Sequence, residues 1–165
     1  MRSYDKWWLP KDMENMGYLF EYCDKYCLDI YNVEIDKIRL MTAFMNSQFR
    51  RSMEKGHPRL LSQSAKDSLR QWIDTDYRGD LTDFLVKNNK KNKGVYAYNQ
   101  FYWVGWMYAY LHYKTRLSSK TIVSRLPIEM MLRHYGLGHE MSKESYYARA
   151  GSKLTFEGEK IGSIN

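Results

Sequence analysis

The chain has 165 residues, the size of a single domain that buries roughly two thirds of its unfolded surface without metal or disulfide support. Its 44% hydrophobic and 27% charged fractions argue against a largely disordered chain, and its aromatic fraction of 16% is high. The net charge of +7 favours an anionic partner, either nucleic acid or the acidic face of another protein.

The start of the chain predicts a cytoplasmic protein. The sequence MRSYDKWWLPKD lacks the apolar stretch of about 7–15 residues that a secretory signal peptide requires. The two cysteines, Cys23 and Cys27, lie four residues apart in a stretch that we expect to be helical, where they suit small core positions better than a disulfide. We therefore expect a reducing compartment and no cofactor.

Helical periodicity marks the first third of the chain. Pro10 suits the first turn of a helix that we expect to reach Tyr31, with one apolar face and one acidic face. Asn32 is the predicted cap of a second helix over residues 33–55, which Gly56 brings to an end.

Two short helices are predicted next, the first beginning at Ser64 and stopping before Gly79, the second beginning at Asp80. The carboxylates in this region suit helix capping and solvated turns, and a divalent cation is the alternative for Asp74, Asp76, Asp80 and Asp83. The segment KNNKKNKG, residues 87–94, holds four lysines and no apolar residue. It is the predicted linker, where one domain spanning 1–165 is most easily divided into subdomains.

The stretch VYAYNQFYWVGWMYAYLHYK, residues 95–114, contains nine aromatic residues and no charge before Lys114. Its polar and tyrosine side chains argue against a membrane span. An apolar surface nearly all round predicts a central helix, capped near Asn99 and surrounded by others. If it is buried throughout, Tyr102→Ala or Trp106→Ala should each cost about 3–5 kcal/mol.

A core cannot easily supply a partner for every tyrosine hydroxyl in this stretch. We therefore expect some of its rings to open onto a cleft or an interface, where aromatic rings beside basic residues also hold single-stranded nucleic acid. The residues assigned to an aromatic platform or to the core are Tyr98, Tyr102, Trp103, Trp106 and Tyr110.

The last third predicts three more helices. Ser118 or its neighbour caps SSKTIVSRL, Pro127 lies in the first turn of PIEMMLRHY, and Gly136 closes that helix. A final helix begins near Ser142 and stops at Gly151, and the tail forms a short C-terminal hairpin or remains mobile. The predicted fold class is all-α, a single compact bundle of six or seven helices around a central aromatic helix.

The strongest charge signal is the segment 84–128, which holds eight bases and no acid. A surface selected only for solubility usually mixes both signs, so this segment favours contact with an acidic partner or with phosphate. The alternative is that these bases face the acidic first helix of the same chain. The candidate contact residues, including one base just beyond the segment, are Lys87, Lys90, Lys91, Lys93, Lys114, Arg116, Lys120, Arg125 and Arg133.

The motif search favours no catalytic class. The chain has no glycine-rich phosphate loop, serine-hydrolase elbow or zinc-protease motif, and its four histidines lack zinc-finger spacing, so we expect neither an enzyme nor a metal site. Residues 117–136 have the outline of a helix-turn-helix, but the second helix offers only Glu129, Arg133 and His134 as its main polar contacts. If this region binds nucleic acid, we therefore expect contacts with the phosphate backbone rather than recognition of base edges.

The span YKTRLSSKTIVSRLPIEMMLRHYGLGHEMSKESYYARA, residues 113–150, resembles the ending of small helical proteins from bacterial toxin–antitoxin and phage-defence loci. The shared features are the SSK helix start, the Tyr-Gly-Leu-Gly-His turn and the short closing helix. The resemblance implies partner binding without catalysis. We therefore expect a noncatalytic bacterial or phage regulatory protein that binds an acidic protein, such as a toxin or an enzyme, with nucleic-acid binding by segment 84–128 as the alternative.

Overall fold

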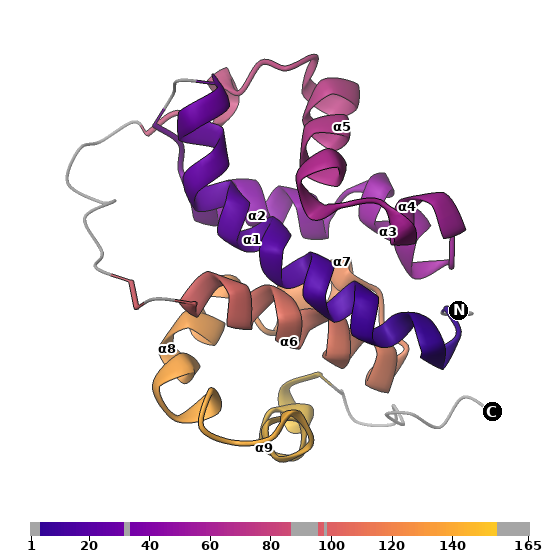
Figure 1. The fold of residues 1–165 in the computed structure, drawn as a ribbon. Coiled ribbons are helices and arrows are strands. Elements are labelled where there is room, and N and C mark those ends of the chain that lie inside the picture. Colours follow the sequence, from indigo (N-terminus) through magenta and orange to yellow (C-terminus); the bar gives the residue numbers. More distant parts are fainter. Residues whose placement is uncertain (1–3, 32–33, 87–95, 98, 155–165) are drawn as a thin grey trace.

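The computed structural model describes residues 4–31, 34–86, 96–97 and 99–154, and within them the chain forms helices and no sheet (Figure 1). The all-α prediction is confirmed, although these ranges hold nine α-helices where six or seven were expected. Short 3-10 turns, η1 (Lys6–Trp8) and η2 (Thr82–Phe84), accompany them. The helices are α1 (Leu9–Tyr31), α2 (Lys37–Met45), α3 (Gln48–Glu54), α4 (Pro58–Ser62), α5 (Ala65–Tyr77), α6 (Gln100–Thr115), α7 (Ser119–Arg125), α8 (Ile128–Gly138) and α9 (Lys143–Leu154).

Local capping explains part of the larger helix count. The predicted helix over 33–55 is divided into α2 and α3, because Ser47 caps a new helix by accepting a hydrogen bond from the Arg50 amide at 3.1 Å. The cap of α2 is Asp36, whose Oδ1 accepts from the Arg39 amide at 3.2 Å. The cap predicted at Asn32 lies outside the described residues.

Three serine caps are confirmed, since Ser64, Ser118 and Ser142 each accept a hydrogen bond from an amide three residues later. The helix predicted from Asp80 is only the short turn η2, whose Thr82 amide donates to Asp80 Oδ1 at 2.9 Å. Capping at these positions was therefore easier to predict than helix length.

The predictions that the last two helices end at glycines were wrong. Gly136 lies inside α8, which continues to Gly138, and Gly151 lies inside α9, which continues to Leu154. Pro127 precedes α8 as its N-cap residue. Both helices pack onto α6, and tertiary packing outweighs the weak helix propensity of a single glycine.

Helix α6 lies at the centre of the bundle, with α1 across one side and α7, α8 and α9 around the other (Figure 1). Asn99 precedes it in a left-handed conformation, with φ of 66° and no capping hydrogen bond from its side chain. The prediction of a central aromatic helix is therefore confirmed. Its buried residues are Phe101, Trp103, Val104, Gly105, Met107, Tyr108, Ala109, Tyr110, Leu111, His112 and Thr115.

Two glycines allow α1 and α6 to approach closely. A Cβ at Gly105 would lie 2.1 Å from the carbonyl oxygen of Met16, so only a glycine fits between the two backbones there. A Cβ at Gly17 would lie 2.7 Å from the Tyr102 ring. The helices run antiparallel, because Gly17 lies beside Tyr102 while Tyr4, ahead of α1, stacks on Tyr113.

This packing joins the two sides of the predicted linker, since α1 precedes residues 87–94 and α6 follows them. The linker itself and the predicted C-terminal hairpin lie outside the described residues. Across the ranges that are described, no helix combines the length and the apolar character needed to cross a lipid bilayer.

Candidate functional site

A groove of about 820 Å³ lies between α1, α6 and the start of α9. We call it the aromatic groove, because tyrosine and tryptophan rings form much of its surface. The residues that line it are Lys6, Leu9, Pro10, Met13, Glu14, Tyr18, Tyr102, Trp106, Tyr110, Tyr113, Lys114, Lys143 and Glu144.

Helix α6 contributes a stripe of four rings to this groove, from Tyr102, Trp106, Tyr110 and Tyr113. Steps of four, four and three residues place these side chains on one face of the helix. Tyr110 is buried at the base of the groove, whereas the other three rings are half-buried. The stripe is therefore an accessible surface on an otherwise central helix.

The predicted platform residues are divided by the structure. Tyr102, Trp106 and Tyr110 line the aromatic groove. Trp103 is buried and makes edge contacts with the rings of Tyr135 and Tyr146, away from the groove. Tyr98 lies outside the described residues.

The opposite wall of the groove comes from α1. Tyr18 is 39% exposed, and its ring contacts Tyr102 edge-on with centroids 5.1 Å apart. Burial raises the pKa of Tyr102, and the nearby Tyr18 and Glu14 add to that rise. The phenol of Tyr102 is therefore protonated at neutral pH and available as a hydrogen-bond donor.

The aromatic groove has mixed charge. It holds three lysines and two glutamates, and Lys143 Nζ lies 3.1 Å from Glu144 Oε1. Lys143 also lies 5.6 Å from the centroid of the Tyr110 ring, and Lys114 lies 5.9 Å from that of Tyr147. Of the predicted basic contact residues, Lys114 lines this groove.

The other described members of that basic set lie elsewhere. Arg116 covers the Tyr113 ring at 5.2 Å, Lys120 lines a separate cavity near Glu54, and Arg125 donates from Nη1 to the Leu154 carbonyl at 2.6 Å. Arg133 lines a third cavity, between α8 and α9. Lys87, Lys90, Lys91 and Lys93 lie outside the described residues.

Acidic side chains of α1 form ion pairs with basic side chains of α2 and α3. Asp24 pairs with Lys37 of α2, and Asp12 pairs with Arg50 of α3. Both bases precede the acid-free segment 84–128. In these two ion pairs, the acids of α1 therefore neutralise other bases than those of segment 84–128, which the alternative prediction had named as their partners.

A fully buried polar network lies behind the groove. Arg50 Nη1 donates to Asp12 Oδ1 at 2.7 Å and Nη2 donates to Oδ2 at 3.0 Å, while Nε donates to Ser119 Oγ at 3.1 Å. The hydroxyl of Tyr4 donates to Asp12 Oδ2 at 2.6 Å. Burial alone would raise the pKa of Asp12, but the charge and hydrogen bonds of Arg50, with the bond from Tyr4, hold it below its ordinary value.

The network continues through Glu54. Its carboxylate accepts the Ser119 amide at 3.0 and 3.1 Å and lies 2.7 Å from His112 Nδ1. His112 Nδ1 is also 2.7 Å from the Leu117 carbonyl, so this nitrogen carries a hydrogen that faces two acceptors. These side chains are buried, and the network joins α1, α3, α6 and α7.

The aspartates proposed as an alternative cation site do not form a group of metal ligands within the described residues. Asp76 accepts a hydrogen bond from the Trp72 indole at 2.9 Å, and Asp80 caps η2. Throughout the described residues, no three histidine, cysteine, aspartate or glutamate side chains are grouped as metal ligands. Cys23 is a buried thiol, as expected, and the side chain of Cys27 is outside the description.

Comparison with protein-family models, curated proteins and solved structures found no match to this chain. The resemblance of residues 113–150 to antitoxin-like proteins therefore stays a prediction. In the structure this span holds the end of α6, then α7, α8 and most of α9, which together lie along one side of the bundle (Figure 1).

Proposed function

We propose that the chain is a noncatalytic regulatory protein that binds a segment of a partner protein in the aromatic groove. The observation that carries this proposal is the stripe of Tyr102, Trp106, Tyr110 and Tyr113, open to a groove of about 820 Å³. Tyrosine and tryptophan are enriched at protein interfaces, because they supply a large contact area with few rotatable bonds.

The shape of the groove favours an amphipathic segment as its ligand. Met13 and Trp106 offer apolar contacts on facing walls, so a helix or an extended strand can place its own apolar side chains between them. Lys6 and Lys114 lie at the end nearest the start of α1, where a carboxylate of an acidic partner has complementary charge. Trp7, 68% exposed and adjacent to Lys6, extends the aromatic surface beyond this end.

The regulatory part of the proposal rests on the resemblance of residues 113–150 to antitoxin-like proteins, which implies a partner such as a toxin or another enzyme. The excess of positive charge, +7 over the chain, agrees with an acidic partner. In this proposal the protein acts by occupying a surface of its partner.

Single-stranded nucleic acid is the second candidate ligand. The rings of Tyr110 and Tyr113 lie beside Lys6 and Lys114, the combination on which bases stack while lysines contact phosphates. Glu144 lines the same groove and pairs with Lys143, and this negative charge weakens the attraction of the groove for a polyanion. A protein segment is therefore the favoured ligand.

The proposal is tested by replacing Trp106 with the photo-crosslinking residue p-benzoylphenylalanine and irradiating host cells that express the variant. The matched control carries the same replacement at Leu137, which is 72% exposed on α8 and lies outside the groove. We expect one protein crosslinked at position 106 and absent at position 137, with the adduct resistant to nuclease.

Purification in 0.05 and 0.5 M salt separates the two candidate ligands. A complex centred on aromatic contacts should persist in high salt, whereas phosphate contacts weaken with a slope of about 0.7 per contact on logarithmic axes for a single strand. A nuclease-sensitive adduct at position 106, together with a complex that dissociates in high salt when it is not crosslinked, would replace the proposal with the second candidate. The same adducts at both positions would overturn the assignment of the groove.

A further inference from the structure

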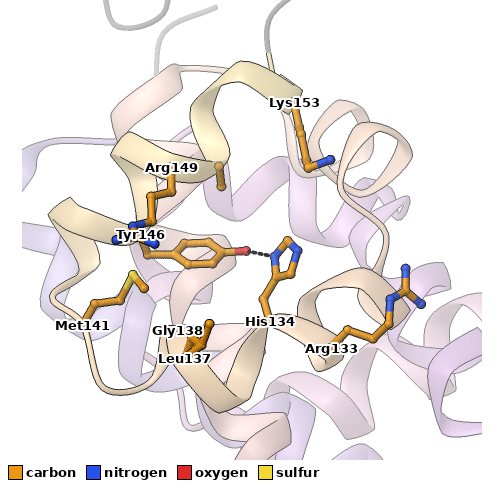
Figure 2. Close-up of a pocket in the computed structure, with 9 residues that line it drawn as sticks. Arg133, His134, Leu137, Gly138, Met141, Tyr146, Arg149 and Lys153 are labelled. Atoms are coloured by element: carbon orange, nitrogen blue, oxygen red, sulfur yellow. Dashed lines mark hydrogen bonds between the residues drawn. The ribbon is translucent and has the colours of Figure 1, made fainter.

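A second cavity, independent of the aromatic groove, lies between α8 and α9 (Figure 2). Its volume is about 280 Å³, at the lower end of small-molecule sites, which span roughly 300–1,000 Å³. We call it the cationic pocket. It is lined by Arg133, His134, Leu137, Gly138, Met141, Tyr146, Arg149, Ala150 and Lys153.

Three cations and no carboxylate line the cationic pocket. Arg133, Arg149 and Lys153 make no ion pair with any residue within the described ranges. This distinguishes the pocket from the aromatic groove, where Glu144 pairs with Lys143. Uncompensated like charges around one cavity raise the local concentration of anions.

The floor of the pocket is apolar and well ordered by contacts. The Tyr146 ring is buried, and its hydroxyl donates to Met131 Sδ at 2.9 Å. The same hydroxyl lies 2.9 Å from His134 Nδ1, so a hydrogen bond fixes the imidazole ring at this nitrogen. Leu137, 72% exposed, and Met141 add apolar surface near the rim.

The pKa of His134 depends on the positive charges around the pocket. Burial lowers the pKa of His134, and the positive charges of Lys153 and Arg133 lower it further. Figure 2 shows the ring with Nδ1 directed at Tyr146 and its other edge toward the side where Lys153 and Arg133 extend. A bound anion would oppose the effect of these positive charges and raise the His134 pKa.

We propose that the cationic pocket binds a small organic phosphate of mononucleotide size. Lys153 and Arg133, which extend on the same side of His134 in Figure 2, contact the phosphate, and the flat organic group lies against Leu137 and Met141 on the side of Arg149. Guanidinium groups match phosphate oxygens in two-point hydrogen bonds, which makes arginine well suited to this anion. The small volume fits a single nucleotide unit better than a strand.

The first experiment follows the imidazole signals of the full chain by NMR from pH 4 to 9, with adenosine 5′-monophosphate, inorganic phosphate or adenosine as the probe. In the free protein, His134 should titrate below the ordinary histidine pKa of about 6.5. Saturating adenosine monophosphate should raise the His134 pKa by about one unit, because the bound dianion stabilises the imidazolium.

Charge variants identify the phosphate contacts. Arg133→Gln or Lys153→Gln should weaken adenosine monophosphate binding by about tenfold each, as expected for loss of one charged hydrogen bond. Lys153→Gln should also raise the His134 pKa in the free protein. Lys120→Gln, an exposed cation in a different cavity, should change neither quantity.

Three results would overturn the proposal. An ordinary His134 pKa in the free protein would show that the positive charges of Lys153 and Arg133 do not act on this pocket. Equal shifts from adenosine and adenosine monophosphate would exclude the phosphate as the recognised group. Equal affinity for inorganic phosphate and adenosine monophosphate would exclude the organic group, and none of these results depends on the function proposed for the aromatic groove.

Discussion

The guanidinium of Arg50 and the carboxylate of Asp12 form a two-point ion pair in which both side chains are fully buried. Arg50 lies on α3 and Asp12 on α1, 38 residues apart in sequence. Replacing both members of such a pair with apolar residues is often tolerated, whereas removing one leaves a buried charge without its partner. The pair therefore makes the position of α3 on α1 specific.

Asp12→Asn should lower the free energy of unfolding by about 3–5 kcal/mol, because Arg50 stays buried and charged without a counter-ion. Urea unfolding followed by circular dichroism measures this loss. The matched control is Asp24→Asn, which removes the partner of Lys37 from a pair whose side chains are 27% and 21% exposed and should cost less than about 1 kcal/mol. Equal losses in the two variants would contradict the assigned role.

Acid should destabilise the protein through Asp12. Its pKa in the folded state lies below the ordinary value of about 3.9, so between the two values the unfolded chain binds more protons and stability rises with pH. The contribution is complete above about pH 5 and is lost as the pH falls through the folded pKa. As the pH is lowered from 6 to 2.5, the urea midpoint of Asp12→Asn should fall less steeply than that of the unmodified protein. Parallel curves for the two proteins would show that Asp12 does not cause the loss of stability in acid.

Gly105→Ala should be strongly destabilising, because the added methyl would lie 2.1 Å from the Met16 carbonyl oxygen and force α1 away from α6. Gly136→Ala is the matched control, since nothing lies within 4 Å of its added Cβ and the position is helical. There the same change should stabilise by about 0.5–1 kcal/mol. Thermal melting of the two variants should therefore shift in opposite directions, and a stabilised Gly105→Ala would disprove the close helix contact.

The two faces of α6 should respond differently to truncation. Tyr108 is fully buried and its hydroxyl donates to the Leu126 carbonyl at 2.6 Å, so Tyr108→Ala should cost about 3–5 kcal/mol. Trp106 is half-buried on the groove side, so Trp106→Ala should cost about half as much or less. This revises the sequence-based expectation that Trp106 and Tyr102 carry the full cost, and equal melting of the two variants would contradict the open face.

Periodicity and local capping explain what the sequence predicted correctly. Apolar steps of three and four residues identify α1 and the region of α2 and α3, and serine at positions 64, 118 and 142 begins a helix in each case. The unusual aromatic density of residues 95–114 identifies the central helix. Helix ends were harder, because the packing of α8 and α9 against α6 continues each helix past a glycine.

The site could be predicted only in part, because its geometry depends on contacts between distant segments. Tyr102, Trp106 and Tyr110 were identified from composition, but the walls of the groove come from α1 and α9. The buried pair of Asp12 and Arg50 gave no signal, since neither position breaks a helical pattern. A glycine inside each apolar helix, at 17 and 105, was the available signal for their close approach.

The pairing of α1 with α6 also affects how the protein is made. Helix α1 is complete at Tyr31, yet its main partner begins at Gln100, so 69 further residues must be added first. At about 5–20 residues per second this takes about 3–14 s, during which the apolar face of α1 has only α2 to α5 as neighbours. The nascent chain therefore exposes Phe20 and Met16 for seconds, long enough for a chaperone to bind before the bundle closes.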